Sequence, residues 1–188
     1  MKLTRAHLKG LSLAAIIAGA LVLGARHRKD DPSGVEVAAE RALAQLDKRT
    51  SREALTARCQ AHTPARANAT GILDRACAAL HELGTFSNEP LAAASRLSEL
   101  THARASSRTQ RDVLAEVQSL RVELLMTAGH SREAAREGQA WADGRRKEAS
   151  VGAVRLWVAA SRANQAIGED DLAHDDAKRA VWLAARVK

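Results

Sequence analysis

Hydrophobic residues recur every three to four positions along most of this sequence, and short polar segments separate the runs, which is typical of amphipathic helices. The clearest run spans residues 109–128, where Val113, Val117, Leu120 and Leu124 share one helical face. Strands have little support, because β-branched residues form no alternating runs, whereas alanine, the best helix former, is the commonest residue. The chain is therefore predicted to be all-α.

Capping residues and glycines set the predicted helix boundaries. The segment Thr50-Ser-Arg-Glu53 is a capping box and predicts a helix that begins there. Gly84 and Gly129 stand where a glycine commonly ends a helix. The predicted helices cover about 50–61, 63–84 or 70–84, 87–105, 109–128, 131–144, 150–167 and 170–187. Their short loops predict antiparallel neighbours.

Residues 1–29 form a separate segment with a basic lead, an uncharged run from Gly10 to Ala25 and a second basic cluster. Sixteen residues at about 1.5 Å each span about 24 Å, slightly less than a hydrocarbon core of ~30 Å. Lys9 and Arg26 can extend this reach by snorkelling. The segment predicts a signal anchor with one transmembrane helix at about 8–26. A signal peptide cleaved after Ala20 or Gly24 is the alternative.

The orientation of this anchor follows from weaker signals. Three basic residues flank each side of the apolar run, so the positive-inside rule gives no decision. A short N-terminal tail before a folded domain favours an exported domain, on the periplasmic side of a bacterial inner membrane. Small residues four apart could pack against another membrane helix, although they are common in such segments. They are Ala15, Gly19, Ala20 and Gly24.

Charge argues against a nucleic-acid partner. The formal net charge is +7, but residues 1–29 hold six of the 29 basic residues and none of the 22 acidic ones. The remainder carries 23 basic and 22 acidic residues, a balance of +1. The basic surface that a nucleic-acid binder needs is therefore not expected.

The sequence contains no recognisable motif for catalysis, for cofactor binding or for metal binding. The sequence has no G-x-S-x-G elbow and no phosphate-binding glycine loop, and no small-molecule substrate is expected. Asp170 and His174 are four residues apart and could share a metal, but no second ligand pair accompanies them. Carboxylates at the start of a helix also match its dipole. No metal site is therefore predicted.

Cys59 and Cys77 are the only two cysteines, and in an exported domain they are candidates for a disulfide. A turn at Pro64 would place them about 13 Å out of register, beyond the ~7 Å Cα limit. A turn that extends to Thr70 would halve this mismatch. Alternatively, Cys77 fills a small packing position as a hydrophobic residue.

Two predicted hairpins share their spacing. Gly129 precedes Ala134 by five residues, Gly168 precedes Ala173 by five, and the glycines are 39 residues apart. The last hairpin reads Trp157-x2-Ala160-Ser161-x2-Asn164, then Ala173-x3-Ala177. Over about residues 110–188 this resembles the tetratricopeptide repeat family, whose motif is W-x2-L-G-x2-Y followed by A-x3-F. Asn164 and Ala177 replace the Tyr and Phe of the motif, and residues 35–105 share only helical character.

The resemblance implies a right-handed superhelix of helix pairs that binds other proteins. In that family the face of Arg155 and Arg162, with Gln165 beside them, lines a concave groove. The resemblance makes these residues candidate contacts to an acidic peptide or a terminal carboxylate, which arginine can bind bidentately. Solvated surface arginines are the alternative.

Trp182 is a second candidate for partner binding. At 100° per residue it points away from the alanines of its helix, among charged residues, and tryptophan is enriched at interaction hot spots. Packing on an earlier helix or at the end of the stack is the alternative.

Together these features predict an anchor at 1–29, a linker at 30–34, a divergent helical region at 35–105 and repeat-like hairpins at 106–188. The expected function is that of a membrane-anchored scaffold or adaptor that binds another protein in the bacterial envelope. A fixed subunit of a larger membrane complex is the alternative, and a metal protein or enzyme is a weaker one.

Overall fold

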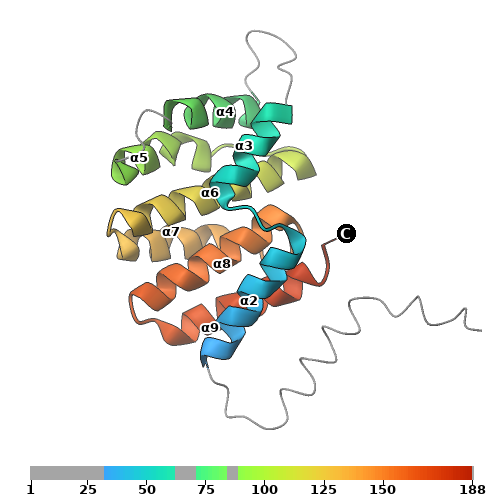
Figure 1. The fold of residues 1–188 in the computed structure, drawn as a ribbon, viewed down its shortest axis with the longest axis vertical. Helices are drawn as coiled ribbons and strands as arrows, with labels where there is room; N and C mark the ends of the chain where they lie inside the picture. The colour runs from blue at the N-terminus through green and yellow to red at the C-terminus, as the bar shows by residue number, and fades with distance from the viewer. Residues whose placement is uncertain (1–31, 62–70, 84–88, 188) are drawn as a thin grey trace, which may run out of the picture.

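The computed structural model describes residues 32–61, 71–83 and 89–187, and within these ranges the chain is helical with short connections and no strand (Figure 1). The prediction of an all-α protein is confirmed. The helices are α2 Pro32–Leu46, α3 Ser51–Ala61, α4 Ile72–Leu83, α5 Pro90–Thr101, α6 Arg108–Thr127, α7 Ser131–Asp143, α8 Val151–Ala166 and α9 Asp170–Ala184.

The predicted anchor, with Ala15, Gly19, Ala20 and Gly24, lies outside the described residues. No described helix combines the length and the apolar character that a membrane crossing needs. The helix α2 begins at Pro32, so residues 32–34 of the predicted linker are helical. Proline suits the first turn of a helix, because the N–H that it lacks has no partner there.

Local polar contacts explain where several helices begin and end. The Thr50 N–H donates to Glu53 Oε2 at 2.8 Å, and the Glu53 N–H donates to Thr50 Oγ1 at 3.2 Å, which completes the predicted capping box. Ser107 and Gln110 form an equivalent box at the start of α6. Gly129 and Gly168 follow α6 and α8 with φ of 80°, a conformation that glycine adopts without steric cost.

The helices α4 to α9 follow one another as a stack, and α2 and α3 lie across it (Figure 1). The helix α2 packs on α9 and α8, whereas α3 packs on α6 and α4. Alanine makes this close packing possible: Ala153, Ala160 and Ala163 of α8 are fully buried. Helix α7 approaches α8 closely at Gly138, since a Cβ atom at this position would lie 3.4 Å from the Ala160 Cα atom.

A disulfide joins Cys59 of α3 to Cys77 of α4, with 5.5 Å between their Cα atoms. Helix α3 ends at Ala61 and α4 begins at Ile72, which agrees with the later of the two predicted starts of this helix. With this start the two cysteines lie level with each other, within the range that a disulfide can span.

Candidate functional site

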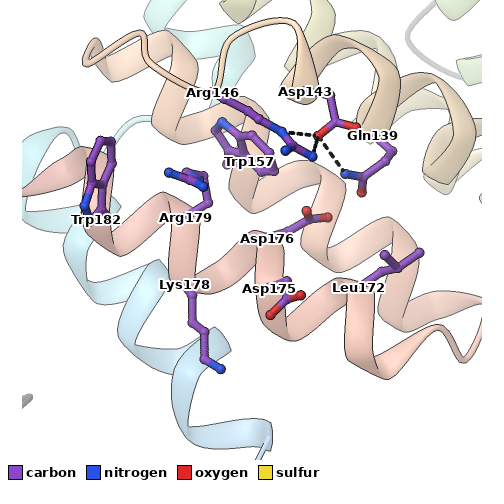
Figure 2. A pocket seen from close by; sticks show the side chains of 10 residues that line it. All are labelled: Gln139, Asp143, Arg146, Trp157, Leu172, Asp175, Asp176, Lys178, Arg179 and Trp182. Atoms are coloured by element: carbon purple, nitrogen blue, oxygen red, sulfur yellow. Dashed lines mark hydrogen bonds and ion pairs between the residues drawn. The ribbon is translucent and has the colours of Figure 1, made fainter.

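A cleft of about 560 Å³ lies between the end of α7 and the outer face of α9 (Figure 2). We call it the Trp182 cleft. One end, the basic end, is formed by Arg146, Trp157, Arg179 and Trp182. The other end, the acidic end, is formed by Leu172, Asp175 and Asp176 of α9. Lys178 of α9 also lines the cleft, but its side chain points away from these two carboxyl groups (Figure 2).

Trp182 is the exposed aromatic group of the cleft. Its side chain is 40% exposed, whereas Ala173, Ala177 and Ala180 on the opposite face of α9 are buried. The guanidinium carbon of Arg186 lies 3.5 Å from the Trp182 ring centroid, and that of Arg179 lies 5.1 Å away. These cation–π contacts hold the indole in place and surround it with positive charge.

Trp157 of α8 contributes a second indole to the basic end. It is only 3% exposed, and its Nε1 atom is buried without a hydrogen-bond acceptor among the described residues. Figure 2 places this indole between the side chains of Arg146 and Arg179. The Arg146 Nε and Nη2 atoms donate to Asp143 Oδ1 at 2.9 and 2.8 Å, which holds the Arg146 guanidinium in place.

Asp176 dominates the acidic end. It is 2% exposed and accepts a hydrogen bond from the Asn164 Nδ2 atom at 2.8 Å. Burial raises the pKa of Asp176 to about 6, and the nearby carboxylates of Asp143 and Asp175 act in the same direction. Hydrogen bonds from Asn164 and Gln139 act against this rise. The carboxyl group therefore titrates near neutral pH.

Arg155, expected in an open groove, is instead buried under the turn between α2 and α3. It is 2% exposed, its Nη1 atom donates to the Arg49 carbonyl oxygen, and its Nη2 atom lies 2.8 Å from Asp47 Oδ2. The expectation of an accessible Arg155 is corrected here, because α2 covers the face of α8 that the resemblance leaves open.

Arg162 and Gln165 lie further along the same face of α8. Arg162 is exposed, and its Nε atom lies 2.5 Å from Glu40 Oε1 of α2. Arg155 and Arg162 line one cavity of about 360 Å³, and Arg162 and Gln165 line another of about 280 Å³. The structure therefore brings these three residues together on the α2 side of α8, whereas Trp182 belongs to a different cleft.

Asp170 and His174 acquire no further ligands. In the part of the chain that the structure describes, no group of three or more His, Cys, Asp or Glu side chains could hold a metal ion. The His174 Nδ1 atom faces Glu36 Oε1 of α2 at 3.9 Å, whereas Asp170 is exposed at the start of α9.

The residues of the basic end other than Trp182 escaped prediction for a physical reason. Arg146 lies in the turn after α7, and Trp157 has the pattern of a core residue, so their meeting depends on how α7 to α9 pack. The sequence does show that positive charge surrounds Trp182, since Arg179 precedes it by three residues and Arg186 follows it by four.

Comparison with known proteins gives no relative, since neither a family model nor a curated protein nor a solved structure matches this chain.

Proposed function

We propose that this protein is a membrane-anchored helical scaffold or adaptor that binds another protein through the Trp182 cleft. The observation that carries the proposal is the exposed Trp182 ring, held by Arg179 and Arg186 at the edge of a cleft of about 560 Å³. Tryptophan and arginine are the residues most enriched at binding hot spots, and pairing them in one rigid cluster lowers the entropy lost on binding.

We further propose that the hairpins α6–α7 and α8–α9 are repeats similar to tetratricopeptide repeats, and their matched spacing supports this. An offset of 39 residues relates the end of α6 to the end of α8 and the start of α7 to the start of α9. The same offset relates Gly129 to Gly168, both with φ of 80°. Stacked hairpins of this kind expose one surface of each added helix, here the outer face of α9.

The predicted anchor at residues 1–29 would confine this scaffold to the membrane plane. Helix α2 begins at Pro32 and packs on α8 and α9, so the anchor would lead directly into the part of the stack that carries the cleft. We place the domain on the periplasmic side of a bacterial inner membrane, where a Cys59–Cys77 disulfide is chemically favoured.

In-cell photocrosslinking tests the docking role. A photoreactive residue replaces Leu172, an exposed side chain of the cleft, or Leu91 on α5, which is similarly exposed but lies outside the cleft. A protein adduct is expected from position 172 and not from position 91, and Trp182→Ala should abolish it. An adduct that survives Trp182→Ala would contradict the proposal. A stoichiometric complex that co-purifies in detergent would instead favour a fixed structural subunit.

Thiol labelling tests the location. In intact cells, a membrane-impermeant maleimide should label Cys59 and Cys77 only after reduction. Labelling that requires permeabilised cells would place the domain in the cytoplasm and contradict the proposed orientation.

A further inference from the structure

We infer that the basic end of the Trp182 cleft binds a carboxylate of the partner, seated against the Trp157 Nε1–H between Arg146 and Arg179. The inference rests on the proposed function in assigning the carboxylate to a protein partner. The carboxylate site itself can be tested on its own.

Trp157 has a hydrogen-bond donor that no described residue uses. Buried N–H groups in folded proteins almost always donate to an acceptor, so an indole nitrogen without one needs an explanation. Trp157 is 3% exposed and lines the cleft, yet its Nε1 finds no acceptor among the described residues. An oxygen atom of a ligand in the cleft would satisfy this donor.

Positive charge flanks the Trp157 side chain in the cleft. Arg146 and Arg179 lie on either side of the Trp157 indole (Figure 2), and Arg179 forms no ion pair with a described residue. Two guanidinium groups on either side of this indole favour a ligand that carries negative charge. Asp143 already contacts Arg146 and would repel a second charge, which favours a singly charged carboxylate over a phosphate.

Carboxyl groups lie at the other end of the cleft. Asp175 is exposed and contacts no described cation, and the buried Asp176 lies next to it. A ligand that spans the cleft therefore meets positive charge at one end and negative charge at the other. A cleft of about 560 Å³ lies within the range of sites that enclose a drug-sized ligand, so it can hold several residues of a peptide. The expected ligand is a short extended segment that carries a carboxylate and, a few residues away, a basic side chain.

Indole resonances provide a direct test. The chain has three tryptophans, so a ¹⁵N-labelled sample shows three Nε1–H signals. The signal that disappears in Trp157→Phe is that of Trp157. The full chain in detergent micelles is titrated with an acetylated, amidated peptide that has lysine and glutamate separated by three alanines. The matched control peptide carries glutamine in place of glutamate.

The Trp157 signal should shift saturably to lower field, with an affinity for the glutamate peptide at least tenfold higher than for the glutamine peptide. Arg179→Gln should remove most of this preference. The matched variant Arg104→Gln removes an exposed positive charge outside the cleft and should leave it unchanged. Equal affinity for both peptides, or a shift of the other two indoles without Trp157, would overturn the inference.

The two proposals fail in different ways. If the Trp157 signal responds to the glutamate peptide but no protein is cross-linked from position 172, the carboxylate site stands and the protein partner is wrong. If a protein is cross-linked and Trp157 does not respond to carboxylates, docking stands and the carboxylate inference is wrong.

Discussion

The Nη2 atom of Arg155 lies 2.8 Å from Oδ2 of Asp47, and this ion pair ties the middle of α8 to the residue that follows α2. Asp47 also accepts hydrogen bonds from the Arg49 side chain at 2.8 to 3.1 Å. The hydrogen bonds from Arg49, assisted by the charge of Arg155, lower the pKa of Asp47 to about 2. The Asp47 carboxylate therefore stays ionised throughout the physiological range.

Removal of Asp47 is expected to destabilise the fold. Asp47→Asn leaves the buried Arg155 without a counter-charge, which costs about 3 kcal/mol in comparable buried pairs. Urea unfolding should show a lower midpoint with an unchanged slope. The control is Arg162→Gln, which breaks the exposed pair with Glu40 and should cost less than about 1 kcal/mol. Equal effects of the two variants would show that burial of Arg155 contributes nothing.

Reduction of the Cys59–Cys77 disulfide should lower stability by about 3 kcal/mol, the value expected for a loop of this length in the chain-entropy account. Thermal unfolding with and without a phosphine reductant measures the change. A double Cys59→Ser and Cys77→Ser variant should unfold at the same temperature as the reduced native protein. The reductant should not change the unfolding temperature of this variant. If the reductant lowers the midpoint of this variant as well, the effect does not come from the disulfide.

Asp176 should make the protein more stable in mild acid. Its pKa is about 6 in the folded protein against an ordinary value of 3.8, so the folded state binds the proton more tightly than the unfolded state. Lowering the pH from 7.5 to 5 should raise the free energy of unfolding by about 1 kcal/mol through this group.

Asp176→Asn provides the control, because the amide cannot titrate. Urea unfolding of both proteins at the two pH values isolates the contribution of Asp176 as the difference between their pH dependences. An identical pH dependence in the variant would show that the native carboxyl group titrates at its ordinary pKa.

Two glycines in helices should respond in opposite directions to alanine. A Cβ atom on Gly152 of α8 would collide with the Asp112 backbone oxygen, and the Gly152 N–H donates to Asp112 Oδ1 at 2.8 Å. Gly152→Ala should therefore cost about 1–3 kcal/mol. Gly34 of α2 has no atom within 4 Å of the added Cβ, so Gly34→Ala should stabilise by about 0.5–1 kcal/mol. Chemical denaturation of both variants measures the change in the free energy of unfolding. Destabilisation by Gly34→Ala would contradict the open surroundings of Gly34 in α2.

Local features of the fold could be predicted from the sequence because their causes are local. The predicted helix at 109–128 agrees with α6 at Arg108–Thr127 to within one residue, since hydrophobic spacing and nearby capping residues determine it. The exposed position of Trp182 likewise follows from the helical period of α9 alone.

Distant contacts could not be predicted in this way. The Val35 and Leu43 side chains of α2 pack with the α8–α9 core, but the sequence shows only that such a helix needs an apolar partner. The burial of Arg155 depends on this choice of partner. The Trp182 cleft depends in the same way on how the turn after α7 passes over Trp157.

The pairing of α2 with α9 has a consequence for synthesis of the chain. Helix α2 leaves the ribosome long before its partner helices α8 and α9. At about 5–20 residues per second, α2 waits roughly 7–30 s before the surface that covers its apolar face exists. Throughout that interval the nascent protein presents an unpaired amphipathic helix, so a chaperone that shields this segment would act before the stack can close.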